Sequence, residues 1–181
     1  DPPDHRDRLA TGGNPCLEQT LESYELCCLV ETFPNKHESL QDFLHSLKFA
    51  TLYGKIVSLG PTPWAHSNRV MMRNRRLGIS MSGLAQFVGD KAEGDWEEVK
   101  RWCNEGYKAV KEADVHVSEE LGIRESIKVT SIKPSGSVSL LNGSTSGLHY
   151  PLSHHYIRRV QIAKSDAKLI SSLIERGFHI E

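Results

Sequence analysis

The 181-residue sequence lacks long apolar runs, an excess of charge of either sign, internal repeats and low-complexity segments. Its longest apolar stretch is a few residues, whereas a transmembrane helix needs roughly 20. The 22 basic and 23 acidic residues leave a formal net charge of −1, and nucleic-acid-binding domains usually show a clear basic excess. We therefore expect no membrane association and no direct binding of nucleic acid.

Targeting and disulfide signals are also absent. No apolar segment typical of a signal peptide follows the charged first residues, and the sequence has no initiating Met, which is typical of a processed chain or an excerpt. The four cysteines, Cys16, Cys27, Cys28 and Cys103, form no Cys-x-x-Cys pair, and paired metal-ligand spacings are missing. We predict free thiols, a cytoplasmic location and no metal site.

Apolar residues at helical spacing predict three helices, at residues 39–58, 95–121 and 165–176. For the second helix, Asp95 and Glu98 form an expected capping pair at the start, and Gly122 ends it. Short β-leaning runs at 77–81, 127–132 and 156–162 alternate with these helices, which indicates an α/β architecture.

Three features have simple structural interpretations. Cys103 lies on the apolar stripe of the long helix, so we interpret it as a buried structural thiol. Asp114-Val115-His116 begins like a motif of some cobalamin proteins, but Glu119 replaces the motif's glycine, so a solvent-exposed helix surface is expected. The arginines at 73, 75, 76, 158 and 159 are interpreted as solvated or ion-paired, with anion binding as the alternative.

The segment Asn14-Pro15-Cys16-Leu17-Glu18 brings an amide, a thiol and a carboxylate within five residues. If the loop is extended, Asn14, Cys16 and Glu18 share one face. An amide can hold a substrate hydroxyl, a carboxylate can accept its proton, and a sulfur can carry out one-electron chemistry. Cys27 offers a second sulfur for a disulfide. A surface turn with an incidental cysteine explains these residues equally well.

A second candidate site is the run from Lys133 to Ser139, directly after the predicted strand 127–132. Small residues at a strand-to-helix turn expose backbone N–H groups, and the amino end of a helix favours anions. This composition predicts a phosphate-binding loop at 134–139, with an ordinary capped turn as the alternative.

Several segments, in order along the chain, resemble ribonucleotide reductases. Residues 14–31 resemble the finger loop of that family, most closely that of monomeric, adenosylcobalamin-dependent ribonucleoside-triphosphate reductases. Further matching stretches lie at 73–83, 127–141, 147–151 and 156–160. Several independent motifs in the same order are far more specific than any single one.

The resemblance implies a role for each residue of the two candidate sites. Cys16 would become a thiyl radical that abstracts the ribose 3′ hydrogen, Glu18 would be the general base on the 3′-hydroxyl, and Asn14 would orient the sugar hydroxyls. Cys27 would be one of two cysteines that deliver reducing equivalents and end as a disulfide. The substrate's phosphates would be held by Ser135, Gly136, Ser137 and Val138.

The fold implied is part of a ten-stranded α/β barrel with a central finger loop. Residues 1–181 would be a partial catalytic barrel, with its finger loop at 11–31 and its phosphate loop at 134–139. The partner cysteine, the specificity loops, most of the cofactor surface and the carboxy-terminal redox tail would lie outside the chain. The isolated segment would then be inactive.

The function implied for the complete enzyme is conversion of ribonucleoside triphosphates to 2′-deoxyribonucleoside triphosphates by thiyl-radical chemistry, which supports DNA synthesis. Adenosylcobalamin would be the cofactor, and a thioredoxin-type dithiol would be the reductant. One alternative is a reductase branch with a different radical generator. Another is a non-catalytic barrel fragment that serves as a binding or assembly module, although the joint presence of Asn14, Cys16, Glu18 and Cys27 favours a catalytic origin.

Overall fold

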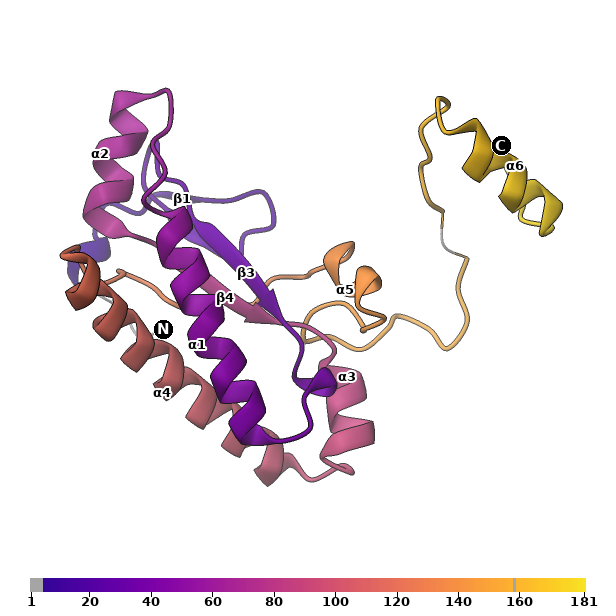
Figure 1. Ribbon diagram of the computed structural model, residues 1–181, viewed down its shortest axis with the longest axis horizontal. Coiled ribbons are helices and arrows are strands. Elements are labelled where there is room, and N and C mark those ends of the chain that lie inside the picture. The colour runs from indigo at the N-terminus through magenta and orange to yellow at the C-terminus, as the bar shows by residue number, and fades with distance from the viewer. Residues whose placement is uncertain (1–4, 158) are drawn as a thin grey trace. The chain divides into compact units, whose positions relative to one another are not determined.

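The computed structural model describes residues 5–157 and 159–181, which form two compact units, Asp1–Pro151 and Leu152–Glu181 (Figure 1). The first unit holds the strands of the described chain and the helices up to α5, and the second holds α6. The elements are η1 (His5–Asp7), β1 (Gly12–Gly13), β2 (Thr20–Leu21), β3 (Cys28–Thr32), η2 (Pro34–Lys36), α1 (Leu40–Val57), α2 (Ala65–Asn74), β4 (Leu77–Met81), α3 (Leu84–Gln86), η3 (Phe87–Lys91), α4 (Trp96–Leu121), α5 (Val138–Leu141) and α6 (Ala167–Glu175).

Two parallel strands form the centre of the first unit. β3 pairs with β4 in a register that runs from Cys28 opposite Leu77 to Thr32 opposite Met81. The chain passes from β3 to β4 through α1 and α2, and α1 packs on the strand pair (Figure 1). The strand expected at 77–81 is confirmed, and the mixed α/β character is as predicted.

The prediction of a continuous strand at 127–132 is wrong. This segment runs beside β4 but forms only one isolated parallel bridge, between Thr130 and Ile79. The Gln19 side-chain amide lies between the two segments and donates to the carbonyl oxygens of Leu77 and Thr130, at 3.3 and 3.5 Å. Backbone hydrogen bonds still join the segment to β4, since the Leu77 and Ile79 amides donate to the Lys128 and Val129 carbonyls, both at 2.9 Å.

Helix α1 confirms the element expected at 39–58. Ser39 caps it, and its hydroxyl accepts a hydrogen bond from the Asp42 backbone amide at 3.3 Å. A Cβ on Gly54 would lie 3.3 Å from the Val30 side chain, so the absence of a side chain lets the helix approach β3 closely. The buried face of α1 consists of Phe43, Leu47, Ala50, Thr51, Gly54 and Lys55.

The long helix α4 begins and ends where its capping residues predict. The Asp95 carboxylate accepts from the Glu97 amide at 2.9 Å, and Gly122 ends the helix in the left-handed conformation at a φ of 62°. Glu98 does not complete the expected capping pair. Its carboxylate instead accepts the indole N–H of Trp102 at 2.8 Å.

Apolar packing between α1 and α4 forms the core. Phe43 stacks on Trp102 with ring centroids 5.4 Å apart, and a Cβ on Gly106 would lie 3.0 Å from Leu47. The small residue on α4 therefore allows the two helices to approach each other. The buried cluster comprises Phe43, Leu47, Ala50, Ile79, Phe87, Val88, Ala92, Val99, Trp102, Val110 and Val129.

The expectation that Asp114 is solvent-exposed is wrong. Its side chain is 2% exposed and pairs with the fully buried ammonium of Lys55 at 2.6 Å. The same carboxylate accepts the backbone amide and the hydroxyl of Ser126, at 2.8 and 2.6 Å. His116, on the next positions of the helix, is exposed as expected. Helical periodicity alone did not reveal a charged partner 59 residues away.

The second unit contains the third expected helix. α6 is capped by Asp166, whose carboxylate accepts the Leu169 amide at 3.3 Å. The expected strand at 156–162 is wrong for its described part, which has no regular secondary structure, and Arg158 lies outside the described residues. Helix α2 was not expected, because it has no side-chain cap at its start.

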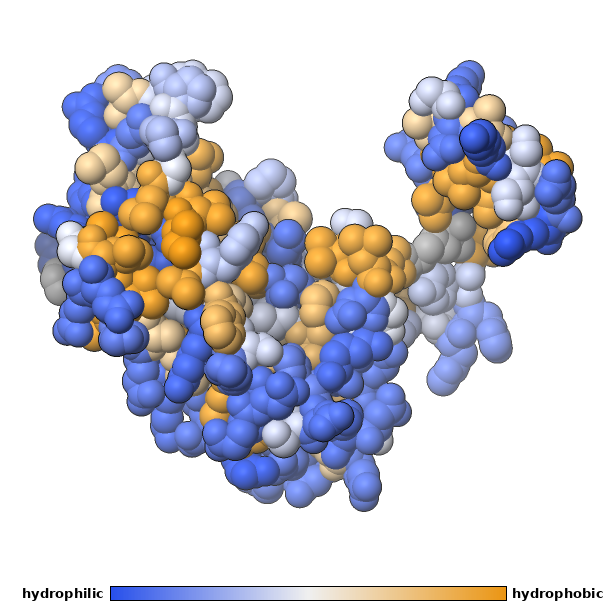
Figure 2. Space-filling model, in the orientation of Figure 1, coloured by the Kyte–Doolittle hydropathy of each residue, from blue (hydrophilic) through white to orange (hydrophobic). Residues whose placement is uncertain are grey.

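Exposed apolar side chains gather on the surface over α1 and α2 (Figure 2). The large apolar residues exposed on α1, α2 and their connection are Phe49, Tyr53, Ile56, Val57, Leu59, Trp64 and Met72.

Within the described residues, no helix is both long enough and apolar enough to cross a membrane.

Candidate active site

The loop that carries the thiol is a closed turn. The backbone amide of Asn14 donates to the Gln19 carbonyl, and the Gln19 amide donates to the Asn14 side-chain oxygen, both at 3.1 Å. Between them, Leu17 adopts the left-handed conformation at a φ of 59°. The condition of an extended loop is therefore not met, although Cys16 and Glu18 still line one cleft.

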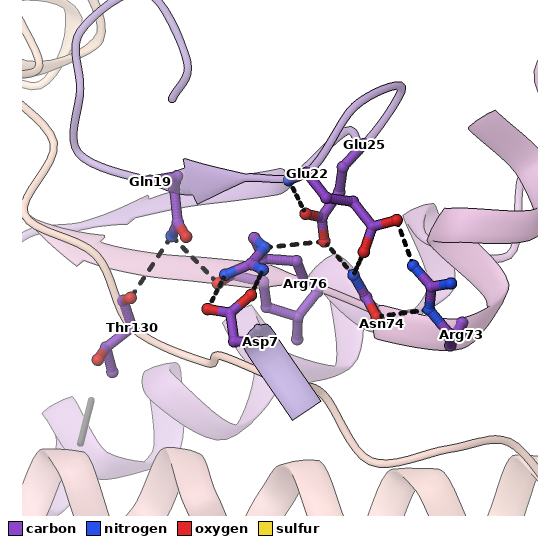
Figure 3. A network of polar contacts seen from close by, with 9 residues as sticks. Asp7, Gln19, Glu22, Glu25, Arg73, Asn74, Arg76 and Thr130 are labelled. Carbon is purple, nitrogen blue, oxygen red and sulfur yellow. Dashed lines mark hydrogen bonds and ion pairs between the residues drawn. The ribbon is translucent and has the colours of Figure 1, made fainter. Parts of the chain in front are cut away.

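Gln19 was missed by the sequence analysis, and it fixes this loop on the sheet. Its side chain is buried and bridges β4 to the segment at Thr130 (Figure 3). A Cβ on Gly78 would lie 2.5 Å from the Leu29 side chain and 2.6 Å from the Gln19 side-chain nitrogen, so a larger residue here would displace these side chains. The nearest sequence signal was the glycine inside a β-leaning run, which often marks a close approach.

A buried ion-pair network holds the end of the loop at 11–31, the predicted finger loop (Figure 3). The Arg76 guanidinium is fully buried, donates to the Glu25 carboxylate at 2.9 Å and pairs with Asp7. The Arg76 carbonyl accepts the backbone amide of Cys28 at 3.1 Å. This network joins the amino-terminal turn, the finger loop and the start of β4 through charge-assisted hydrogen bonds.

Of the arginines considered above, those at 73, 75 and 76 are used for structural pairing, as the first interpretation proposed. Arg73 pairs with Glu22, and Arg75 donates to the Ser58 carbonyl at 2.5 Å. Asn74, between them, donates to Glu25 at 2.8 Å. The arginines of this stretch therefore neutralise or hydrogen-bond neighbouring elements.

A cleft of about 720 Å³ opens beside the finger loop. Its walls come from four parts of the first unit, including the finger loop and both long helices. The finger loop contributes Cys16, Leu17 and Glu18, the strand region contributes Ser80, Met81, Thr130 and Ser131, the following segments contribute Pro134 and Leu148, and α1 and α4 contribute Phe43, Trp102, Cys103 and Tyr107.

The Glu18 carboxylate is the clearest sign of a ligand site. Both of its oxygens are buried, and neither has a hydrogen-bond donor among the described residues. Buried carboxylates are normally paired or hydrogen-bonded, so this group is arranged to accept from something outside the chain. A hydroxyl-bearing ligand would satisfy it.

The thiols of the finger loop lie in different surroundings. Cys16 is exposed, whereas Cys27 is half-buried and Cys28 is buried on β3. Burial raises the pKa of Cys27, and the negative charge of Glu18 raises it further. Burial likewise raises the pKa of Cys28. A raised pKa favours the protonated thiol over the nucleophilic thiolate in both groups.

The loop at 134–139 only partly joins the cleft. Pro134 lines it, Ser135 is buried, and Gly136, Ser137 and Val138 are exposed. The Ser135 hydroxyl is buried and has no partner among the described residues. Because α5 has only four residues, anion binding here would depend on individual amides more than on a helix dipole.

Cys103 contacts both the apolar core and the cleft, and the sequence predicted only the first of these contacts. It packs against the apolar core, in agreement with the structural interpretation, and burial raises its pKa. It also lines the same cleft as Cys16. Among the described residues, no three His, Cys, Asp or Glu side chains cluster so as to hold a metal ion.

Comparison with curated proteins finds close relatives over nearly the whole chain. The sequence is 58% identical over 178 residues to a probable adenosylcobalamin-dependent ribonucleoside-triphosphate reductase of Dictyostelium discoideum. It is 53% identical over 179 residues to the enzyme of that name from Euglena gracilis. These alignments cover 98% and 99% of this chain but only 23% and 24% of the relatives. No family profile matches the sequence.

Solved structures agree with the sequence comparison. A crystal structure of a B12-dependent, class II ribonucleotide reductase matches 80% of this chain with a TM-score of 0.73 and 31% identity, over 23% of its own length. The α subunit of the Actinobacillus ureae class Id ribonucleotide reductase matches at a TM-score of 0.53 and 18% identity, which shows a likeness of fold alone. The chain is therefore homologous to one segment, about a quarter of the length, of adenosylcobalamin-dependent ribonucleoside-triphosphate reductases.

Proposed function

We propose that this chain supplies the finger loop and part of the phosphate site of a ribonucleoside-triphosphate reductase. The observation that carries the proposal is the cleft in which exposed Cys16 and the unpartnered carboxylate of Glu18 lie together. In the complete protein, residues 1–181 would be part of a ten-stranded α/β barrel, with the finger loop at 11–31 in its centre.

Each site residue then has one task. Cys16, as a thiyl radical, removes the 3′ hydrogen of the ribose, and Glu18 accepts the proton of the 3′-hydroxyl. Asn14 holds the sugar hydroxyls through its side-chain nitrogen, because its oxygen is engaged by the Gln19 amide. The buried, unpartnered acceptors of Glu18 match the hydroxyl donors of a sugar.

The overall change needs two electrons and two protons. The substrate loses its 2′-hydroxyl as water and gains a hydrogen at that carbon, while Cys27 and a second cysteine outside this chain are oxidised from two thiols to one disulfide. A thioredoxin-type dithiol would reduce that disulfide again. The raised pKa of Cys27 suits this task, because it keeps the proton that the reaction consumes on the sulfur.

The cofactor proposed is adenosylcobalamin, on the names of the relatives. When bound, it supplies the radical that generates the Cys16 thiyl. Among the described residues, the exposure of Cys16 fits such a group, because it leaves the sulfur accessible. We assign the corrin surface to parts of the longer relatives outside the matched segment.

Reductases with another radical generator are the nearest alternative, and the relatives at 53–58% identity favour adenosylcobalamin. A non-catalytic binding module is disfavoured, since such a module would not require a thiol beside an unpartnered buried carboxylate. Because all four cysteines are free, we further propose a reducing compartment such as the cytoplasm.

The decisive experiment transplants this segment into a full-length reductase. The 181 residues replace the corresponding segment of the Euglena gracilis enzyme, and deoxynucleotide formation from ribonucleoside triphosphates is measured with adenosylcobalamin and a dithiol. We expect turnover in this chimera and none above background for the isolated chain. Cys16→Ser should reduce turnover by at least about a thousandfold, because an oxygen radical is much harder to form than a thiyl.

Cys103→Ser is the matched control, because Cys103 lines the same cleft and should carry no radical. We expect nearly normal turnover and a stability loss of about 1–3 kcal/mol from a hydroxyl in a partly apolar site. An active Cys16→Ser chimera, or equal loss of activity in both folded variants, would contradict the assignment.

The phosphate loop is tested by Gly136→Val in the same chimera. A Cβ at Gly136 meets no atom within 4 Å, so the fold should tolerate the larger side chain. If phosphates approach the amides of this loop, the added methyl groups should raise the KM by about tenfold or more, at a cost of about 1.4 kcal/mol of binding. An unchanged KM in the folded variant would exclude the loop from the site; Ser137→Thr should be nearly silent.

A further inference from the structure

Glu31 is a half-buried acidic residue that contacts Ser80, a residue of the cleft wall. It lies on β3, four residues after Cys27, and its Oε1 accepts the Ser82 hydroxyl at 2.5 Å. The Ser80 hydroxyl donates to the same oxygen at the longer distance of 3.4 Å. Ser80 and Ser82 are 3% and 0% exposed and Glu31 is half-buried, so these contacts are partly shielded from water.

Each serine hydroxyl also accepts a hydrogen bond from a backbone amide, and the two amides belong to different segments beside the cleft. The Ser80 hydroxyl accepts the Lys133 backbone amide at 3.0 Å, and Lys133 directly precedes the loop at 134–139. The Ser82 hydroxyl accepts the Gly147 amide at 2.9 Å. A hydroxyl has one proton to donate, and both serines direct it to Glu31 while accepting a backbone amide.

The two segments held in this way also touch each other. A Cβ on Gly147 would lie 3.0 Å from the Lys133 carbonyl oxygen and 3.3 Å from the Pro134 Cα. Gly147 has a φ of 56°, which favours glycine at this contact. The residues that follow the two contact points, Pro134 and Leu148, both line the cleft.

The second oxygen of Glu31 faces a different environment. Oε2 is buried and has no hydrogen-bond donor among the described residues. Burial is the main cause of a raised pKa at Glu31, the hydrogen bonds from Ser82 and Ser80 and the Lys133 charge oppose it, and the Glu18 charge adds to it. The Glu18 carboxylate of the loop therefore acts electrostatically on Glu31 of β3.

We propose that Glu31 is a positioning residue, which sets the segments at Lys133 and Gly147 relative to the finger loop and thereby shapes the nucleotide cleft. The expected effect on substrate binding rests on the proposed function. The positioning itself rests on the serine contacts. Glu31 would touch no reacting atom. It would act through two serine hydroxyls on the backbone that precedes Pro134 and Leu148.

The first test uses hydrogen exchange on the 181-residue chain. Glu31→Gln keeps an oxygen acceptor for both serines, whereas Glu31→Leu removes it. Loss of a hydrogen-bond network of this kind should accelerate exchange at the Lys133 and Gly147 amides by about tenfold in Glu31→Leu, and by less than about twofold in Glu31→Gln. The Cys28 amide, bonded to the Arg76 carbonyl, is the reference for general destabilisation.

The second test uses the chimeric reductase and separates KM from kcat. Glu31→Leu should raise the KM for the ribonucleoside triphosphate by about tenfold and change kcat by less than about threefold, while Glu31→Gln restores the KM. Ser82→Ala should reproduce part of the effect, since it interrupts only the Gly147 branch.

The outcomes separate this inference from the proposed function. Unchanged exchange at Lys133 and Gly147 in Glu31→Leu would overturn the positioning role, and so would a Glu31→Gln variant that behaves like Glu31→Leu. If exchange changes as expected but the unsubstituted chimera forms no deoxynucleotide, the reductase function is refuted. The exchange data would then still support a positioning role of Glu31 for the two segments.

Discussion

The helical layer of α1 and α4 and the finger loop are held in place by different forces. Between the helices, rings and aliphatic side chains such as Phe43, Leu47 and Trp102 exclude water, with Lys55 and Asp114 as a buried ion pair at one point. The finger loop buries little apolar surface. It is fixed by the Arg76 ion pairs and by the Gln19 amide (Figure 3).

The difference separates global stability from placement of the thiol. Apolar packing is nondirectional, so the helical layer should tolerate small shifts and determine the free energy of unfolding. Hydrogen bonds to charged groups are directional and short, so the loop network should determine where Cys16 and Glu18 lie. Substitutions in the two regions should therefore affect different measurements.

The largest effect on stability is expected from Phe43→Ala. Phe43 is 2% exposed and stacks on Trp102, so its truncation should lower the free energy of unfolding by about 3–5 kcal/mol. Urea denaturation measures this loss. The matched control on the same helix is Phe49→Ala, because Phe49 is 59% exposed and should cost less than about 1 kcal/mol. Equal losses would refute the assignment of the core.

A smaller effect, confined to the loop, is expected from Glu25→Gln. The change removes a buried charge beside Arg76, and breaking a buried pair costs about 3 kcal/mol. Part of this cost should be local, so the alkylation rate of Cys27 should rise more than the change in global stability predicts. Glu97→Gln, at an exposed pair with Lys100, should cost less than about 0.5 kcal/mol. An unchanged Cys27 rate would contradict the role of the network.

The smallest effect is a pH dependence that Glu31 contributes. Its pKa is raised from 4.5 in the folded chain, so between pH 4.5 and the folded pKa the folded state binds more protons than the unfolded state. Stability from this group is therefore present below pH 4.5 and is lost as the pH rises through the folded pKa. Glu18 and Lys133 act on Glu31 in opposite directions, and burial outweighs both.

Glu31→Gln should abolish this contribution, which urea denaturation between pH 4 and 7 would reveal. We expect the variant's free energy of unfolding to fall less than that of the unsubstituted chain over this range. A steeper fall in the variant would mean that Glu31 is stabilised, not destabilised, in its ionised form.

The elements that could be predicted are those whose signals are local. Helices α1, α4 and α6 follow from apolar spacing of three and four residues and from Ser39, Asp95 and Asp166 as caps. Strand β4 follows from a short β-leaning run. The segment at 127–132 forms only an isolated bridge to β4, and its contact with Gln19, more than 100 residues earlier in the chain, has no local signal.

The candidate site was predicted in part for the same reason. Cys16 and Glu18 are close in sequence, so their meeting at one cleft could be expected, although the loop is a closed turn. Cys103 on the cleft wall could not be expected from its helical stripe. The roles of the site residues stay predictions until the chimeric enzyme is measured.

The sequence by itself determined the residue types of the site, the approximate boundaries of α1, α4 and α6, and the homology to the reductases, because these depend on neighbouring residues and on their order. Only the tertiary structure decided which polar groups are buried without partners and which are paired. Glu31, Gln19 and Asp114 look alike in the sequence as single polar residues. Their difference arises because burial and hydrogen bonding are fixed by segments roughly 50 to 110 residues away.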